Sequence, residues 1–466
     1  MGLTPLLLSR LQFAFTISYH IIFPAFTIGL AAWMMILEGL HMATGKPVYG
    51  RLFSFWLKVF GVAFGLGVVS GVVMGFEFGT NWSRLSETTG PIQGPLLAYE
   101  SFTAFALEAS FFGVLIFGRT RVSKPVYFFA VAMVALGTTL SAFWIMVNNS
   151  WMQAPTGFVI QDGVYVATDW AKIVFSRVVW VRFAHMLLAS FLTGAFCVAA
   201  TGAWYRLRGT YAAEGLEMLR AGLFLAALLV PAQILSGHLN GDYVHDLQPA
   251  KFAAIEGRWH DEQPAGEVLL ALPDAHAATN HFEVKVPVLG SLIGSLRPDS
   301  KEVGLTDFPR RDWPPVAIPF FSFRIMVGCG LLMLAVAWIG SLLAVLGRLE
   351  CSRLMLWATF LSFPLPFFAI LTGWFTAEVG RQPWTVYGLL RTADSVTPGL
   401  TVPETVASLA MFVCIHALIF GFGVFYIYRL LQAGPAGALP GHSPGPNRPL
   451  GLSEAAGQPP SREGEP

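Results

Sequence analysis

The sequence predicts an all-α integral membrane protein with about nine transmembrane helices, its N-terminus outside and its C-terminus cytoplasmic. Three observations predict this fold. Hydrophobic residues make up 55% of the 466 residues and charged residues only 12%, whereas soluble domains carry about 25% charged residues. Apolar runs of about 20 residues recur along the chain, long enough to cross a bilayer as helices and too long for barrel strands. Basic residues concentrate in alternate loops, which sets the orientation.

Composition also excludes several classes of function. The net charge is +1 and no basic block is present, so nothing in the sequence indicates a nucleic-acid partner. The four cysteines lie singly, without the spacing of a metal site, and we interpret them as small packing residues. The first ten residues lack a basic segment followed by a cleavage site, so we expect no removable signal peptide.

The apolar runs divide the chain into helices and connections. We predict spans near residues 13–37, 54–78, 96–118, 125–148, 180–203, 217–238, 322–346, 354–378 and 405–430. Pro364 and Pro366 predict a kink within the eighth span. The resulting organisation places helices 1–6 in 1–238, an external loop in 239–321, helices 7–9 in 322–432 and a disordered cytoplasmic tail, rich in Gly, Pro and Ser, in 433–466.

Orientation follows from the basic residues of the short loops. One set of loops holds Lys46, Arg51, Arg119, Arg121, Lys124, Arg206, Arg208, Arg348, Arg353 and Arg429. The opposite set holds Arg84, Lys172, Arg177, Arg381 and Arg391. Since cytoplasmic loops are the richer in Lys and Arg, the first set is predicted to be cytoplasmic and the 239–321 loop external.

Polar residues inside the spans carry the functional signal. A carboxylate such as Glu378 costs about 2.5–3.5 kcal/mol at the centre of a membrane helix, so it needs a cation, a metal or the membrane surface beside it. The topology places His20, His185, Met326 and Glu378 near the outer side of the bilayer, on four helices. Singly, such a His is more often an interhelical hydrogen-bonding residue and such a Met a core residue. Together, His and Met form the axial ligand pair of a six-coordinate electron-transfer haem.

Two further carboxylates share the third span. Glu100 and Glu108 are eight positions apart, which is about 80° around a helix and about 12 Å along it. Such a ladder suits proton transfer, because burial lets each acid lose and regain a proton. Simple hydrogen bonding between helices explains the pair equally well, and both interpretations stand at this point.

Several strings now resemble a known family. They are Ser9–Phe15 with Tyr19-His20, Gly75–Trp82, Phe183–Met186, Lys251–Gly257, Phe323–Val327 and Gly373–Trp384. In this order they resemble subunit I of the cytochrome bd-type quinol oxidases, over residues 5–430. The external loop is similar in length to that of the short-loop branch, which includes members resembling cyanide-insensitive oxidases.

The resemblance implies a role for each matching residue. His185 and Met326 match the axial pair of a low-spin haem b. His20 and Glu378 match the ligands of a high-spin haem b and of the oxygen-reducing haem, without settling which holds which. The implied cofactors are two haems b and one haem d, or a further haem b in place of haem d. Lys251 and Glu256 match quinol-binding residues of the external loop, and Glu100 and Glu108 match proton-transfer residues. The positions expected to line the haems are Arg324, Trp374 and Arg381, although lipid contact or ordinary packing also explains them.

The implied protein oxidises quinol at the outer face and reduces O2 to water with cytoplasmic protons, generating a proton gradient without pumping. Its expected partners are a second membrane subunit (subunit II), a small single-span accessory subunit, ubiquinol or menaquinol, O2 and the bilayer. Its expected location is the bacterial cytoplasmic (inner) membrane, as a multi-pass protein. The alternative is a haem-free transporter or proton channel, which predicts inverted repeats and polar residues at the midplane. A structural subunit without catalysis leaves the four converging ligands unexplained.

Overall fold

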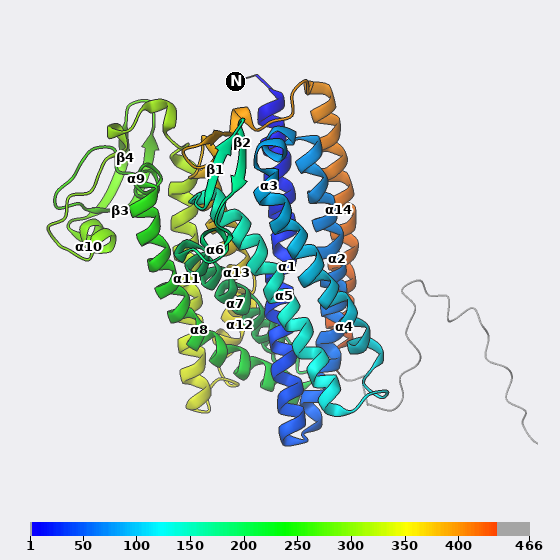
Figure 1. Ribbon diagram of the computed structural model, residues 1–466. Coiled ribbons are helices and arrows are strands. Elements are labelled where there is room, and N and C mark those ends of the chain that lie inside the picture. Colours follow the sequence, from blue (N-terminus) through cyan, green and yellow to red (C-terminus); the bar gives the residue numbers. More distant parts are fainter. Residues whose placement is uncertain (1, 436–466) are drawn as a thin grey trace, which may run out of the picture.

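The computed structural model describes residues 2–435 and confirms the helical membrane fold. Within these residues, nine helical segments are long and apolar enough to cross a bilayer. Three of them are interrupted or preceded by a shorter helix (Figure 1). Their bounds are α1 (Pro5–Thr44), α2 (Pro47–Thr80), α3 (Ser83–Tyr99) continuing through η1 (Glu100–Phe105) to α4 (Ala106–Phe117), α5 (Lys124–Gln153), α6 (Trp170–Val174) with α7 (Arg177–Arg208), α8 (Ala212–Leu247), α11 (Ala317–Val345), α12 (Arg353–Leu361) with α13 (Leu365–Val379), and α14 (Val402–Ala433). The tail expected to be disordered lies, from residue 436 on, outside the described residues.

Two of the spans are broken, for different reasons. The eighth span divides between α12 and α13, and Pro364 and Pro366 stand at the start of α13, so the predicted kink is confirmed. The third span contains a π-helical turn, η1, which begins at Glu100 and was not predicted. A π-turn inserts one extra residue into the helical repeat and occurs frequently at functional sites. The even spacing assumed for Glu100 and Glu108 therefore does not hold, because the turn between them is wider than an α-turn.

The long loop between α8 and α11, predicted to be external, is an ordered subdomain rather than a plain connection. It contains α9 (Pro249–Glu256), an antiparallel hairpin of β3 (Glu267–Asp274) and β4 (Thr279–Val286), and α10 (Leu289–Ser295). Two 3₁₀ turns, η2 (Leu305–Asp307) and η3 (Arg310–Asp312), lead back to α11. The sixth helix, predicted to end near 238, continues to Leu247. Its last turns are polar and escape a search for apolar runs, and the helix ends only where Pro249 disfavours helical geometry in the residue before it.

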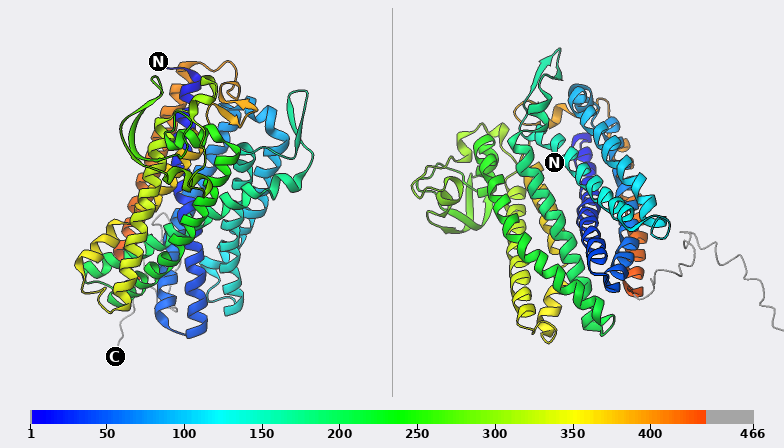
Figure 2. Two further views of the ribbon diagram at one scale, coloured as in Figure 1. Left: turned by 90° about the vertical axis from the view of Figure 1, so that its left-hand side faces the viewer. Right: turned by 60° about the horizontal axis from the view of Figure 1, so that its bottom comes forward.

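Smaller hairpins gather at the same end of the bundle. β1 (Phe158–Gln161) pairs with β2 (Val164–Ala167) in the 149–179 connection. β5 (Trp384–Val386) pairs with β6 (Leu390–Arg391) before the short η4 (Thr392–Asp394). Figures 1 and 2 show these hairpins and the loop subdomain at the end of the bundle where the N-terminus lies. The short loops richest in Lys and Arg lie at the other end.

The centre of the bundle depends on a close approach between α1 and α7. A Cβ atom on Gly29 would lie 2.2 Å from the carbonyl oxygen of Ser190, and one on Gly194 would lie 2.7 Å from the carbonyl carbon of Gly29. Only glycine lets the two backbones meet so closely, as is usual for helices that pack in lipid. This contact positions α7, and with it His185, against the first helix.

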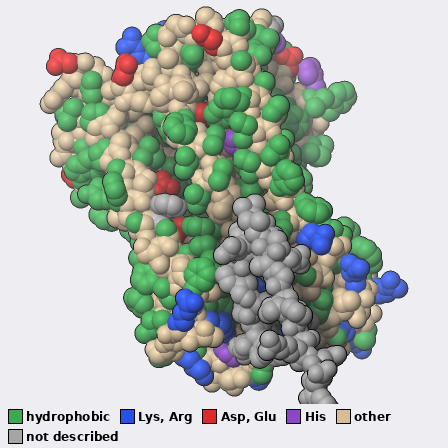
Figure 3. Space-filling model, turned by 90° about the vertical axis from the view of Figure 1, so that its right-hand side faces the viewer, with side chains coloured by type: hydrophobic (Ala, Val, Ile, Leu, Met, Phe, Trp, Pro, Cys, Tyr) green, Lys and Arg blue, Asp and Glu red, His purple; other side chains and the backbone are tan. Residues whose placement is uncertain are grey.

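The outer faces of the bundle are apolar, as a lipid-facing surface requires. Exposed large side chains on α2, α4 and α14 include Val72, Phe76, Ile116, Phe422 and Phe425. Figure 3 shows hydrophobic side chains over the middle of this face, with Lys and Arg gathered toward its lower end and acidic side chains toward its upper part.

Candidate functional site

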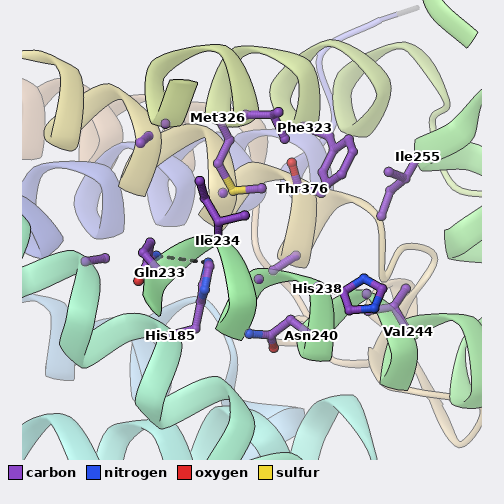
Figure 4. A pocket seen from close by; sticks show the side chains of 18 of the residues that line it. His185, Gln233, Ile234, His238, Asn240, Val244, Ile255, Phe323, Met326 and Thr376 are labelled. Atoms are coloured by element: carbon purple, nitrogen blue, oxygen red, sulfur yellow. Dashed lines mark hydrogen bonds between the residues drawn. The ribbon is translucent and has the colours of Figure 1, made fainter. Parts of the chain in front are cut away.

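A large apolar cavity lies between α7, α8, α11 and α13 and is closed on one side by the loop subdomain. Its volume is about 590 Å³. His185 enters it from α7, and Met326 enters it from α11 on the opposite side (Figure 4). The sequence predicted that these two side chains would converge, and the structure brings them to one cavity.

The hydrogen bonds of His185 fix which ring nitrogen carries the proton. Ser236 Oγ donates to the carbonyl oxygen of Gln233 at 3.0 Å, so it accepts from His185 Nδ1, also at 3.0 Å. His185 Nε2 is then the unprotonated nitrogen, and the Gln233 side-chain amide faces it at 3.3 Å (Figure 4). A hydroxyl that fixes Nδ1–H and aims the Nε2 lone pair into a cavity is the usual support of a metal-ligating histidine.

Met326 is placed by a glycine. A Cβ atom on Gly373 of α13 would lie 2.8 Å from Met326 Sδ, so only glycine leaves this room for the sulfur. Trp374 follows it, and within residues 2–435 its indole Nε1 is buried without a hydrogen-bond partner. An apolar cavity with an opposed imidazole and thioether and an unused donor fits a flat iron porphyrin. Among the described residues, no three His, Cys, Asp or Glu side chains gather as they would around a bare metal ion.

Glu378 lies outside this cavity, in a polar network at the end of α13. Asn149 Nδ2 and Gln153 Nε2 each donate to its Oε1 at 3.0 Å, and Arg381 Nη2 donates to its Oε2 at 2.5 Å. Arg182 in turn donates to the Asn149 side chain at 2.5 Å. The cation that Glu378 needed is therefore Arg381, reinforced by two amides. Arg381 Nε and Nη1 stay buried without a partner in the described part of the chain.

Lys251 joins this network to the cavity. Its Nζ donates to the carbonyl oxygen of Ala377 at 2.9 Å and to Gln153 Oε1 at 3.2 Å, and the side chain also lines the cavity. Burial lowers the pKa of Lys251 to about 7, against the opposing effect of the Glu378 carboxylate. Gln153 thus contacts both Lys251 and Glu378, and the sequence analysis did not single it out.

Glu256 lines the same cavity, 4% exposed, at the end of α9. Arg324 uses its donors on the loop subdomain, and its expected place beside a haem stays a prediction. Its Nη1 donates to the carbonyl oxygen of Ile255 at 2.8 Å, and its Nε donates to that of Val268 at 3.1 Å. These bonds tie the loop to α11 directly before Met326.

His20 occupies a separate position between α1 and α2. Its Nδ1 lies 2.9 Å from Ser70 Oγ, which donates to the carbonyl oxygen of Gly67 at 3.0 Å. As at His185, the serine hydroxyl accepts from Nδ1, and Nε2 is the unprotonated ring nitrogen. His416, interpreted from the sequence as structural, is 2% exposed and packs edge-on against Tyr19 at 4.6 Å between ring centroids.

The two acids of the third span face the bundle. Glu100 Oε1 accepts from Ser141 Oγ of α5 at 3.1 Å, which is the interhelical hydrogen bond that one interpretation expected. Glu108 is 7% exposed, in α4. Neither Glu100 nor Glu108 is among the residues that line the apolar cavity.

Sequence reasoning missed Asn149, Gln153 and Arg182. All three have a signal: they are strongly polar side chains at the ends of apolar runs, and Arg182 directly precedes the string Phe183–Met186. A search restricted to metal-ligand types passes over the amides and cations that hold such ligands.

Comparison with known proteins identifies the family. The family model for cytochrome bd terminal oxidase subunit I matches residues 8–435. The chain is 33% identical to the cytochrome bd-II ubiquinol oxidase subunit 1 of Escherichia coli, over 92% of this chain and 96% of that one. It is also 33% identical to the cytochrome bd ubiquinol oxidase subunit 1 of Bacillus subtilis, over 93% and 94%.

The fold agrees as well. The structure of the bd oxidase from Geobacillus thermodenitrificans superposes with a TM-score of 0.87 at 26% identity, over 92% of this chain and 99% of that one. The resemblance read from the short strings is thereby confirmed, with its implication of haem cofactors and of quinol:oxygen oxidoreductase activity. This chain belongs to the cytochrome bd terminal oxidase subunit I family.

Proposed function

We propose that this chain carries the haems of a terminal oxidase that oxidises quinol at the outer face and reduces O2 with protons from the cytoplasm. The observation that carries the proposal is the cavity itself. His185 and Met326 oppose each other across it, and Lys251 and Glu256 form the wall on the loop side. One space therefore holds a ligand pair for electron transfer and a cation and carboxylate for a quinol.

In this proposal His185 Nε2 and Met326 Sδ hold a low-spin haem b, which accepts electrons one at a time when bound. Lys251, whose pKa is lowered to about 7 by burial, holds a quinol oxygen. Glu256 accepts a proton from the quinol hydroxyl, since its Oε2 is buried without a partner within the described residues. His20 and Glu378 hold the high-spin haem b and the oxygen-reducing haem, which is haem d or a further haem b.

The direction of proton movement follows from the proposed orientation. The end of the bundle richest in Lys and Arg is assigned to the cytoplasm, which the charge distribution in Figure 3 supports. Glu108 and Glu100 then carry protons from that side toward the site of oxygen reduction. Each elementary charge moved stores about 2.3 kcal/mol per 100 mV, so a gradient forms without a pump.

The proposed assembly is a heterodimer with subunit II in the bacterial inner membrane, joined by a small single-span subunit. The apolar outer faces of α2, α4 and α14 support contact with lipid or with such membrane helices. Either ubiquinol or menaquinol is the expected substrate, and O2 is the electron acceptor.

A reduced-minus-oxidised visible spectrum of the purified membrane protein tests the proposal. Haem b bands are expected, and a far-red band distinguishes haem d from a further haem b. A spectrum without haem bands would overturn the proposal and leave the haem-free transporter or proton channel as the better explanation.

A further inference from the structure

A second carboxyl group stands beside Glu256, on a strand that the roles assigned so far do not use. α9 ends at Glu256, and Gly257 turns the chain with φ of +65°. β3 then begins at Glu267, which is 8% exposed. Both carboxyl groups line the cavity, and the side chain of Glu267 hydrogen bonds to that of Glu256.

Arg324 holds the two backbone segments that carry these carboxyl groups next to each other. Its hydrogen bonds reach the carbonyl oxygens of Ile255, one residue before Glu256, and of Val268, one residue after Glu267. Its Nη2 lies 3.8 Å from Glu267 Oε1. One guanidinium group therefore fixes both backbones and supplies a charge beside the pair.

The other charged groups around the pair are few. Arg258, 5% exposed, has Nε and Nη1 buried without a partner in the described part of the chain, and its charge acts on Glu267. On the α8 wall of the cavity, His238 and Asp242 lie 3.8 Å apart. Lys285 of β4 is engaged by Glu262 and does not neutralise the pair.

Two buried carboxyl groups in hydrogen-bond contact cannot both ionise at little cost, so they share a proton and titrate as a pair. Burial, and then the hydrogen bond and charge of Glu256, raise the pKa of Glu267 to about 9. Glu256 Oε2 is buried, and no N–H or hydroxyl group of the described residues donates to it.

We propose that Glu256 and Glu267 act as one proton-sharing pair, in which Glu256 takes each proton from quinol and Glu267 releases it outward. This inference rests on the proposed oxidation of quinol in the cavity. Quinol becomes quinone by losing two electrons, which pass to the haems of the oxidase, and two protons. The first proton moves to Glu256, Glu267 gives up its own proton to the outer solvent, and the proton on Glu256 then passes to Glu267. The second proton repeats the cycle.

A polar cavity lies on the other face of β3, because Gly266 and Val268 line it and the side chain between them, Glu267, does not. It has a volume of about 390 Å³ and is lined by Arg258, Gly266 and Val268, which flank Glu267, together with the acidic Glu262 and Glu283. Glu267 itself lines the apolar cavity, where quinol is proposed to bind, and is 8% exposed, so in this proposal it releases its proton through that exposed part of the loop subdomain.

The test replaces Glu267 in the complete oxidase. Glu267→Gln keeps a hydrogen-bond donor toward Glu256 but cannot carry a proton, so turnover with a soluble quinol should fall at least about tenfold, as for loss of a proton-transfer group. The KM for quinol and the haem bands should stay unchanged, and the solvent isotope effect should rise. Glu267→Asp should restore part of the turnover, and Asp299→Asn, an exposed carboxyl of the same loop, should behave as wild type.

A second measurement, the pH dependence of the melting temperature, tests the carboxyl pair independently of enzyme turnover. Because the folded pKa of Glu267 lies above its unfolded value, folded protein binds the extra proton between pH of about 4.5 and 9, and stability falls as pH rises through that window. The melting temperature of wild type should therefore decline over this range more steeply than that of Glu267→Gln. The proposed proton-sharing pair would be refuted if the melting temperatures of wild type and Glu267→Gln declined equally with pH. It would also be refuted if Glu267→Gln kept the wild-type turnover and isotope effect. Absence of haem or of quinol oxidation in wild type would instead overturn the proposed function, while the melting curves still decide whether the pair exists.

Discussion

Two carboxylate sites at the same end of the molecule differ in how completely they are neutralised. Glu378 receives three hydrogen bonds, from Asn149, Gln153 and Arg381. Glu267 has another carboxyl as its near partner, and its nearest cation, on Arg324, is 3.8 Å away. The first environment stabilises a permanent anion, and the second favours a bound proton. Buried carboxylates in one protein can thus have opposite tasks, and the number of donors around each tells them apart.

The two sites are connected through Gln153 and Lys251. Gln153 donates to Glu378 and accepts from Lys251, which lines the cavity together with Glu256. A change in the protonation of Lys251 therefore acts on the Gln153 side chain that holds Glu378. This gives a physical contact between the proposed quinol site and the proposed haem ligand.

The largest expected effect comes from neutralising the fixed anion. Glu378→Gln leaves the Arg381 guanidinium buried with two unused nitrogens and no counter-charge, which costs about 3–5 kcal/mol when one partner of a buried pair is removed. We expect a lower melting temperature and loss of one haem signal. The change in melting temperature should have the opposite sign, or be zero, in the other variant: Glu267→Gln should melt at or above the wild-type temperature at pH 8. A similar loss of stability in both variants would show that the two environments do not differ in this way.

A smaller effect is expected at the link between the sites. Lys251→Met removes the cation proposed to hold quinol, and methionine has a similar length and suits a buried apolar wall. Turnover should fall about tenfold or the KM for quinol should rise as much, with all haem bands in place, as steady-state oxidation and spectra would show. The matched variant is Lys285→Met. It removes a β4 lysine that is paired with Glu262, and its turnover should match that of the wild type. Loss of haem bands in Lys251→Met would assign Lys251 to the structure of the Glu378 network instead.

The sequence predicted the parts of this site that depend on residue type and depth in the membrane. The spans and the common depth of His185 and Met326 followed from apolar runs and the positive-inside rule, and the pairing of these two residues was implied by the family resemblance. It could not predict the π-turn at Glu100, because a π-turn has no apolar period of its own. It also could not predict the hydrogen bonds of Arg324, because they go to carbonyls of residues that are distant in sequence and that only the folded loop brings near.

The hydrogen-bond partners of Glu378 could not be predicted either, because they too are distant from it in sequence. Asn149 and Gln153 end a helix more than two hundred positions earlier in the chain, and an amide near the end of an apolar run is unremarkable until its contact is known. Sequence reasoning correctly required a partner for the buried carboxylate but named iron first. The structure supplies Arg381 and the amides, and iron ligation by Glu378 stays a prediction.

The smallest predicted effect tests the fit of Met326 within its cavity. Gly373→Ala places a methyl group 2.8 Å from Met326 Sδ, closer than real contacts allow, so the thioether must shift by a few tenths of an ångström. The low-spin haem band should move or weaken, and its potential should change, because the axial sulfur sets the haem potential. Gly328→Ala is the matched control on α11, since a Cβ there meets nothing within 4 Å. The stronger variant Met326→Leu should remove or convert only the low-spin signal. Unchanged spectra in both Gly373→Ala and Met326→Leu would show that the low-spin haem does not bind in this cavity. The cavity would then have no role in electron transfer.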